Sequence, residues 1–298
     1  MKHVTTSALA AVIAAAAAPD PGYVKQIETW RRERLQRLTA DGGWLTVAGL
    51  AWLKPGANRF GADAAGNDIV LPAHAAPAQA GTLVLEKGRV RVEVRPGVTV
   101  TLAGKPVTAA ALRSDAGGAE PDVLSLGAVT MQIIDRGGRL GVRVKDMKSP
   151  ARAKFKGLQY FPIDPNYRVV ARFVPNAKPT TIKVPNVLGM VEEMPSPGTA
   201  WFMIGGVAGL AEQKLTAVLE PGEKQLFFIF NDSTSGKTTY GGGRFLYADP
   251  AVNGKVVLDF NKAYSPPCAF TAYATCPVPP PSNRLPIKIE AGEMFAGH

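Results

Sequence analysis

Histidine is scarce in this chain, which contains only three among its 298 residues. His3 lies near the N-terminus and His298 is the last residue, so only His74 is available within a folded body. A serine-histidine-aspartate triad would depend on His74, and the Gly-x-Ser-x-Gly motif of many serine hydrolases is absent. Zinc sites built on several histidines are excluded for the same reason. The sequence therefore predicts no metal site and contains no motif for a bound cofactor.

Long apolar runs and nucleic-acid-binding motifs are also missing. No run reaches the roughly 18 apolar residues that a membrane-spanning helix needs, so no membrane span is expected. Lysine and arginine exceed aspartate and glutamate by 34 to 24, which gives a formal net charge of +10. The basic residues are scattered, and no helix-turn-helix, zinc finger or RNA-recognition motif is present. We therefore expect no nucleic-acid partner, and a small polar or anionic molecule is the preferred class of ligand.

The N-terminal residues have the layout of a secretory signal peptide. Lys2 precedes an apolar stretch that runs from Ala8 to Ala18 and ends in small residues. We expect residues 1–18 to be a signal peptide and the protein to be exported, in the periplasm of a bacterium. The alternative is a disordered or helical N-terminal extension.

The remaining pattern predicts a mainly β fold, in which antiparallel sheets pack as a sandwich or barrel behind one N-terminal amphipathic helix. The helix is expected within residues 19–43, where apolar residues recur at helical spacing between Tyr23 and Leu38. The arginines between them, Arg31, Arg32, Arg34 and Arg37, are predicted to form a solvated face, with contact to an anion as the alternative. Short alternating strands separated by glycine and proline turns follow, with a boundary at residues 146–150. The predicted β-rich halves are residues 44–146 and 147–298.

The C-terminal segment 263–293 is rich in proline and poor in regular patterns, yet it contains aromatic residues. So long an irregular loop in a compact domain is usually either functional or disordered, and the aromatic residues argue against disorder. Both cysteines of the chain, Cys268 and Cys276, lie here. In an oxidising compartment they are expected to form a disulfide. A redox or nucleophilic thiol, a metal-binding thiolate pair and simple packing remain alternatives.

The same segment contains the motifs PPCAF, CPVPP, NRLP and IEAGE, and DSTSGKTTYGGGRFLY and LDFNKAYSPP come before them. In these motifs the sequence is similar to a bacterial family known as domain of unknown function 1684. The resemblance extends upstream through GWLTVAGLAWL at residues 43–53 and NDIVLP at residues 67–72. Ser265 stands where the family usually has asparagine, and Asn231 where it often has a basic residue. The resemblance implies no particular activity.

Residues 58–134 contain a glycine turn, NDIVLP, a glycine hairpin, a short turn before Lys105 and then VLSLGAVTMQII. In this order of turns and strands they resemble a forkhead-associated domain. Such domains bind phosphothreonine through an arginine and a serine-arginine pair. Here Ala62 stands at the arginine position, and AHAAPAQAG stands where the pair would fall. The resemblance therefore implies a topology without phosphopeptide recognition.

Candidate site residues gather in the C-terminal half. In the strand VVLDFN, alternation places Asp259 and Asn261 on one face. The glycine-rich stretch from Thr234 to Arg244 lacks the spacing of a phosphate loop and predicts a hairpin turn, although its basic side chains could surround an anion. The expected ligand-binding residues are Tyr240, Arg244, Asn261, Tyr264, Asn283 and Arg284, and the candidate catalytic carboxylates are Asp232, Asp259 and Glu290. The alternative is a buried polar network that ties the loop to the sheet.

Three functions follow from these residues. The leading hypothesis is an exported protein that binds a small polar or anionic ligand, or an envelope partner, through its C-terminal half. The second is a hydrolase that uses paired carboxylates on a sugar or an ester. The third is a structural envelope module without a ligand. The sequence does not predict the oligomeric state.

Overall fold

The computed structural model describes residues 20–204 and 211–295, so the predicted signal peptide, residues 1–18, lies outside the described residues. Helix α1, Pro21–Thr39, confirms the expected N-terminal helix. The carboxylate of Asp20 caps it by accepting a hydrogen bond of 2.8 Å from the backbone N–H of Tyr23. Proline suits the first helical position because that residue needs no N–H. Gly42, with φ of 74°, lies in the turn that follows the helix.

A β-sandwich follows the helix. One sheet has the order β3-β2-β4-β5-β8 and the other the order β1-β11-β10-β9-β6-β7, and all pairs are antiparallel except β2 with β3. Leu83 and Val92 from the first sheet pack with Met131 and Val142 from the second in one buried cluster. The strands are β1 Val47–Trp52, β2 Gly56–Gly61, β3 Ile69–Val70, β4 Gly81–Glu86, β5 Arg89–Val94, β6 Val100–Leu102, β7 Lys105–Val107, β8 Ala109–Leu112, β9 Val123–Leu126, β10 Val129–Arg136 and β11 Arg139–Asp146.

The C-terminal half contains a second group of sheets. A four-stranded antiparallel sheet has the order β14-β13-β12-β17, and β15 pairs with β16 beside it. These strands are β12 Arg168–Pro185, β13 Val191–Phe202, β14 Gln213–Ala217, β15 Leu226–Phe230, β16 Arg244–Ala248 and β17 Lys255–Asp259. All five residues of β15 are buried, as its unbroken apolar sequence LFFIF predicts. Residues 234–243 belong to the connection between β15 and β16, and Arg244 begins β16, so the predicted hairpin turn is confirmed.

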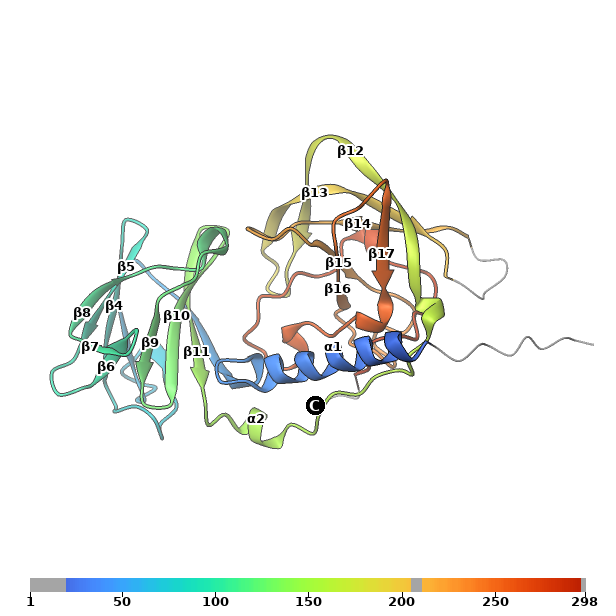
Figure 1. Ribbon diagram of the computed structural model, residues 1–298. Coiled ribbons are helices and arrows are strands. Elements are labelled where there is room, and N and C mark those ends of the chain that lie inside the picture. Colours follow the sequence, from blue (N-terminus) through green and yellow to red (C-terminus); the bar gives the residue numbers. More distant parts are fainter. Residues whose placement is uncertain (1–19, 205–210, 296–298) are drawn as a thin grey trace, which may run out of the picture.

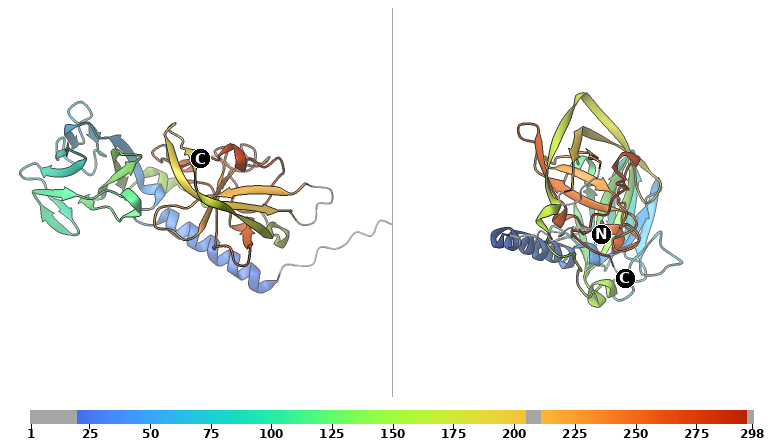
Figure 2. Two further views of the ribbon diagram at one scale, coloured as in Figure 1. Left: turned by 90° about the horizontal axis from the view of Figure 1, so that it is seen from above. Right: turned by 90° about the vertical axis from the view of Figure 1, so that its right-hand side faces the viewer.

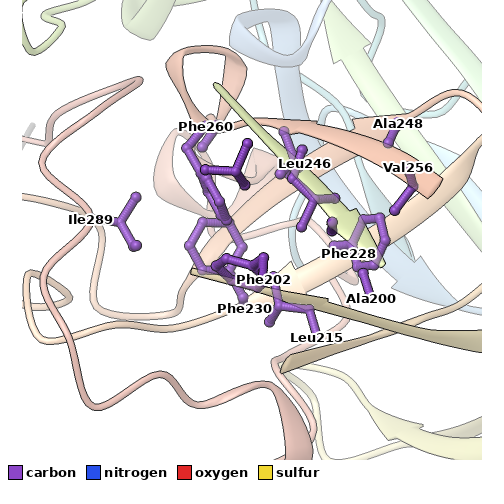
Figure 3. Packing of buried hydrophobic residues seen from close by; sticks show 14 of the residues in the cluster. Ala200, Phe202, Leu215, Phe228, Phe230, Leu246, Ala248, Val256, Phe260 and Ile289 are labelled. Atoms are coloured by element: carbon purple, nitrogen blue, oxygen red, sulfur yellow. The ribbon is translucent and has the colours of Figure 1, made fainter. Parts of the chain in front are cut away.

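The core of the C-terminal half is aromatic (Figure 3). Phe228 and Phe230 of β15, Phe202 of β13 and Phe260 after β17 are buried in one cluster. The rings of Phe230 and Phe260 meet edge to face, with their centroids 5.6 Å apart. Large buried rings of this kind contribute heavily to core stability. The C-terminal half therefore has a hydrophobic core of its own.

Short helices complete the chain. They are α2 Pro150–Lys154 and the 3-10 turns η1 Trp44–Thr46, η2 Ala116–Gly118, η3 Pro165–Tyr167, η4 Phe260–Lys262, η5 Pro267–Ala269 and η6 Pro281–Asn283. Figure 1 shows the two halves side by side, with α1 along the C-terminal half. In Figure 2 the end of α1 points toward the N-terminal sandwich. Because α1 precedes the sandwich in sequence but lies along the other half, it links the two halves.

Gly292, in the IEAGE motif, allows the end of the chain to pass close to the segment after β17. Its φ is 79°, and a Cβ atom there would come within 2.4 Å of the Ala263 carbonyl oxygen and 2.6 Å of the Phe260 carbonyl oxygen. Gly254, in the turn before β17, has a similar φ of 70°, but nothing lies within 4 Å of its Cβ position. An alanine at Gly254 would therefore meet backbone strain alone, whereas an alanine at Gly292 would meet both backbone strain and steric overlap.

We expect Gly292→Ala to lower the free energy of unfolding by about 3 kcal/mol or more. Left-handed strain contributes about 1–2 kcal/mol and overlap adds about 1–3 kcal/mol. Urea unfolding of purified variants measures the change. Gly254→Ala is the matched control and is expected to cost only the strain. Equal losses in the two variants would contradict the close contact at Gly292.

Candidate functional site

A cavity of about 1000 Å³ lies between α1 and the C-terminal sheets. We call it the helix cleft. Trp30 and Arg34 of α1 line it on one side, and Tyr247 of β16, Lys255 of β17 and Tyr264 line it on the other. Residues more than 200 positions apart in sequence therefore share its walls. A concave site with apolar walls and a few polar groups is typical of small-molecule binding.

Aromatic rings stack along the cleft. The rings of Tyr247 and Tyr264 are nearly parallel, at 15°, with centroids 6.4 Å apart. Behind them Tyr247 stacks on Phe227 at 4.6 Å. Trp30 of α1 lies 6.2 Å from Tyr264 across the cleft. Packing against neighbouring rings restricts the motion of Tyr247 and Tyr264, so they provide a firm apolar surface.

Glu220, in the turn after β14, lines the helix cleft, and its surroundings shift its pKa. The Tyr247 hydroxyl donates a hydrogen bond of 2.5 Å to its Oε2 atom. Burial raises the pKa of Glu220, and repulsion from the carboxylates of Glu223 and Glu192 raises it further, although the bond from Tyr247 acts in the opposite direction. A carboxyl group with a raised pKa in a cleft is suited to proton transfer. The sequence pattern gave no reason to select Glu220.

A buried ion pair attaches α1 to the C-terminal segment. Nε of Arg34 lies 3.3 Å from Oε2 of Glu293, and both side chains are buried. Arg34 also donates to the Ser265 carbonyl oxygen at 3.0 Å, and the Ser265 N–H donates to Glu293 at 3.2 Å. Burial raises the pKa of Glu293 despite the nearby guanidinium. The prediction that the helix arginines form a solvated face is therefore wrong for Arg34, because the C-terminal segment covers it.

The predicted pair Asp232 and Arg244 lies within the protein core. Arg244 is fully buried, and its Nη2 atom lies 2.5 Å from Oδ2 of Asp232. The same guanidinium donates to the carbonyl oxygens of Ile289 and Ala291, at 2.8 and 2.5 Å. Burial lowers the pKa of Arg244, while Asp232 acts in the opposite direction. The arrangement joins β16 to the C-terminal segment, as the structural alternative predicts.

Asp259 and Asn261 lie in a second polar cluster, near the start of α1. The Tyr23 hydroxyl donates to Asp259 at 2.8 Å, and the amide of Asn261 donates to the Tyr23 hydroxyl at 2.9 Å. Asn261 also exchanges hydrogen bonds with the backbone of Asp164. Burial and the neighbouring Asp259 carboxylate raise the pKa of Tyr23. Only Asp259 of the predicted pair lines the helix cleft.

The other predicted residues are dispersed. Asn283 is buried and bonds to both backbone groups of Thr216 and to the Ile229 carbonyl oxygen, so it joins β14 to β15. Arg284 and Glu290 are exposed. The Tyr240 hydroxyl donates to the Cys268 carbonyl oxygen at 3.2 Å. Of all the predicted site residues, the structure brings Asp259 and Tyr264 to the helix cleft.

The two cysteines are neighbours but are not bonded to each other. Both are free thiols, and the backbone N–H of Cys268 donates to Sγ of Cys276 at 3.1 Å. The hydrogen bond to Cys276 lowers the pKa of Cys268. The structure therefore has two adjacent thiols where the sequence predicts a disulfide, and the disulfide stays a prediction.

Residues 20–204 and 211–295 contain no group of three or more histidine, cysteine, aspartate or glutamate side chains that could hold a metal ion. In the same ranges, every helix is too short or too polar to cross a bilayer. The only histidine among these residues, His74, is exposed and lies 3.3 Å from Asp146.

The family described as "Protein of unknown function (DUF1684)" matches residues 153–294. An uncharacterized protein of Haloarcula marismortui, solved by NMR, is 33% identical over 48% of this chain and 78% of its own, with a TM-score of 0.40. Residues 153–294 therefore belong to the DUF1684 family. The matched range includes the Arg244 and Asn283 clusters and the segment 263–293 that carries the family motifs. The resemblance of the C-terminal motifs is thereby confirmed, while the upstream stretches 43–53 and 67–72 lie outside the matched range.

Forkhead-associated domains are also among the similar solved structures. One, from an ABC transporter of Mycobacterium tuberculosis, is 30% identical and covers 30% of this chain and 77% of its own, with a TM-score of 0.23. Another, from an Arabidopsis thaliana hypothetical protein, is 16% identical and covers 34% and 86%, also with a TM-score of 0.23. The comparison with curated proteins finds no match.

We expect Arg244→Ala to lower the free energy of unfolding of this DUF1684 protein by about 3–5 kcal/mol, because the change leaves Asp232 buried without its partner. Chemical unfolding of the purified variant measures the loss. Arg284→Ala removes the same charge from an exposed position and is expected to change stability by no more than about 0.5 kcal/mol. A folded Arg244→Ala variant of unchanged stability would show that the ion pair is not needed to hold the segment.

We expect Glu220→Gln to stabilise the protein at neutral pH. Because folding raises the pKa of Glu220, its contribution to stability is complete below the ordinary glutamate pKa of about 4.3 and is lost as the pH rises through the raised value. The gain from Glu220→Gln should therefore grow with pH and vanish near pH 4. Urea unfolding across this pH range provides the measurement, with exposed Glu290→Gln as the control. A gain independent of pH would contradict the raised pKa.

Proposed function

We propose that the protein is a small-molecule binding protein whose ligand, polar and at least partly anionic, occupies the helix cleft. The observation that carries this proposal is the cleft itself, a cavity of about 1000 Å³ lined by stacked aromatic rings and by charged side chains. A volume of this order is that of a typical ligand site. A ligand in the helix cleft would contact the C-terminal half, because Tyr247, Lys255 and Tyr264 form one side of the cleft.

The class of ligand follows from the lining. Tyr247, Tyr264 and Trp30 offer apolar surface to a ring or a short carbon chain. Arg37, Arg168 and Lys255 line the same cleft and supply positive charge. Such groups fix the orientation of a ligand through charge-assisted hydrogen bonds. A small ring-containing molecule with an acidic group fits both features.

Export forms part of the same proposal. The signal-like residues before Pro19 would direct the protein to the periplasm, where the oxidising conditions favour a bond between Cys268 and Cys276. The present distance of 3.1 Å between Cys268 N and Cys276 Sγ supports this, because the side chain of one cysteine already contacts the backbone of the other. Intact mass of the exported protein measures both the cleavage and the loss of two hydrogens.

A second candidate function is hydrolysis of a sugar or an ester by paired carboxylates. The observation that favours it is Glu220, which lines the cleft, has a raised pKa and accepts a hydrogen bond from Tyr247. Glu220 would act as the acid, and Asp259, which also lines the cleft, would act as the base. Under this function Glu220→Gln would abolish turnover but retain the bound molecule.

Native mass spectrometry of the protein purified from its own host tests the binding function. We expect a small molecule on the wild-type protein and its loss from Trp30→Ala, because Trp30 forms one wall of the cleft. Trp201→Ala is the matched control, since Trp201 lies on β13 and stacks with Arg172 and Lys214 outside the cleft. It should retain the molecule.

Far-UV circular dichroism establishes that both variants are folded. A wild-type protein without added mass would favour the structural module, and equal retention by the two tryptophan variants would place the ligand outside the helix cleft.

A further inference from the structure

A second cavity of about 470 Å³ lies where the two halves of the molecule meet. We call it the junction cavity. Arg143 of β11 and Asp115 line it from the N-terminal half, and Glu192 of β13 and Cys276 line it from the C-terminal half. Trp44 and Glu220 line both this cavity and the helix cleft. Trp30 lines only the helix cleft, so the two cavities can be tested separately.

Arg143 is a buried cation without a counter-ion. It is 5% exposed, and its Nε and Nη2 atoms are buried without a hydrogen-bond partner. Its described neighbours include the ring of Trp44, 4.8 Å from the guanidinium, and no ion pair joins it to any carboxylate of residues 20–204 or 211–295. A buried, unpaired guanidinium is costly, because it has lost its hydration without replacement.

The position of Arg143 follows from strand alternation. Val142 and Val144 of β11 face the core of the sandwich, so Arg143 and Lys145 lie on the opposite face. Lys145 has a partner there, because its Nζ atom donates to the Gly42 carbonyl oxygen at 2.7 Å. Burial and repulsion from Arg136 lower the pKa of Arg143 to about 10. The guanidinium therefore keeps its charge at neutral pH and needs an anion.

Arg136, the other arginine of the cavity, is already paired. Its guanidinium lies 3.0 Å from Asp115, and its Nε atom donates to the Thr275 hydroxyl at 3.0 Å. Because the Asp115 carboxylate pairs with Arg136, it does not pair with Arg143. The free positive charge of the cavity is therefore that of Arg143.

Carboxylates line both walls of the junction cavity, with Asp115 and Asp135 on the wall of the N-terminal half and three glutamates on the wall of the C-terminal half. Glu192, Glu220 and Glu223 all line the junction cavity. The first and last of these carboxylates repel Glu220 closely enough to raise its pKa. Within the described ranges, none of the three forms an ion pair with lysine or arginine. This wall favours a cation, whereas Arg143 favours an anion.

We propose that the junction cavity binds a small zwitterion, whose carboxylate pairs with Arg143 and whose ammonium group lies among Glu192, Glu220 and Glu223. A simple anion would be repelled by the three glutamates, and a simple cation would leave Arg143 unpaired. A molecule that carries both charges can pair its negative group with Arg143 and its positive group with the glutamates. Amino acids, longer amino-carboxylates and short peptides belong to this class. The site is additional to the helix cleft and does not depend on the function proposed for it.

Matched probes test the pairing of charges. Isothermal titration calorimetry of the full chain would compare glycine, 4-aminobutanoate and 6-aminohexanoate with hexanoate and hexylamine at constant ionic strength. We expect the best-fitting amino-carboxylate to bind at least about tenfold more tightly than either singly charged probe, since a hydrogen bond to a charged group contributes at least about that factor. Failure of every amino-carboxylate to bind, or equal binding of hexanoate, would overturn the proposal.

Variants then assign the two ends of the probe. Arg143→Gln should weaken the best amino-carboxylate at least about tenfold, whereas Arg139→Gln removes an exposed arginine of the same strand and should change nothing. Glu223→Gln, at an exposed turn, should reduce the preference for the amino-carboxylate over hexanoate without risk to folding. Retained binding in both Arg143→Gln and Glu223→Gln would exclude the site.

Trp30→Ala distinguishes the two cavities. We expect it to leave binding of the amino-carboxylate unchanged, because Trp30 does not line the junction cavity. Loss of binding in Trp30→Ala, with Arg143→Gln unaffected, would assign the probe to the helix cleft and overturn the proposal.

Discussion

The structure of the C-terminal half depends on the burial of two guanidinium groups. Arg244 has no exposed surface and holds the carbonyl oxygens of Ile289 and Ala291 together with Asp232. Arg34 of α1 pairs with Glu293 two residues further along the same segment. Because a buried charge without its partner is unfavourable, these contacts require the segment 263–293 to take one path. That path places Tyr264 in the wall of the helix cleft.

Both cavities lie where elements distant in sequence come together. The helix cleft separates α1 from the strands of the C-terminal half, and the junction cavity separates the two halves. Ligand sites are common at such contacts between structural units, where packing is less continuous than within a core. Trp44 and Glu220 line both cavities, so a ligand in one can alter the charge and packing of the other's wall. Helix α1 lines the helix cleft, whereas Trp44, which follows the helix, lines both cavities.

Buried polar residues divide into two kinds in this protein. Asp232, Asn261 and Asn283 have their hydrogen-bonding groups met by neighbouring backbone or side chains, so they specify the path of the chain. Arg143 is buried with unpaired nitrogen atoms, and Glu220 has a raised pKa beside a cavity. Nε of Arg244 and the hydroxyls of Ser265 and Tyr160 are also buried without a hydrogen-bond partner, but Arg143 lines a cavity. An unmet polar group beside a cavity suggests a role in binding.

Local sequence determined the helix at Pro21–Thr39, the β-rich character, the hairpin around residues 234–244 and membership of the family. These features depend on the spacing of neighbouring residues, on turn residues and on contiguous motifs, all of which can be read along the chain. Tertiary structure alone decided which polar residues line a cavity. Arg34 is buried by a partner 259 positions away, and Arg143 lies on an outward strand face that the other half of the chain covers. The sequence predicts both Asn283 and Arg244 as ligand-binding residues, but long-range packing places both side chains in the core. Burial and charge pairing depend on such distant contacts, and alternation along one strand does not specify what covers its outer face.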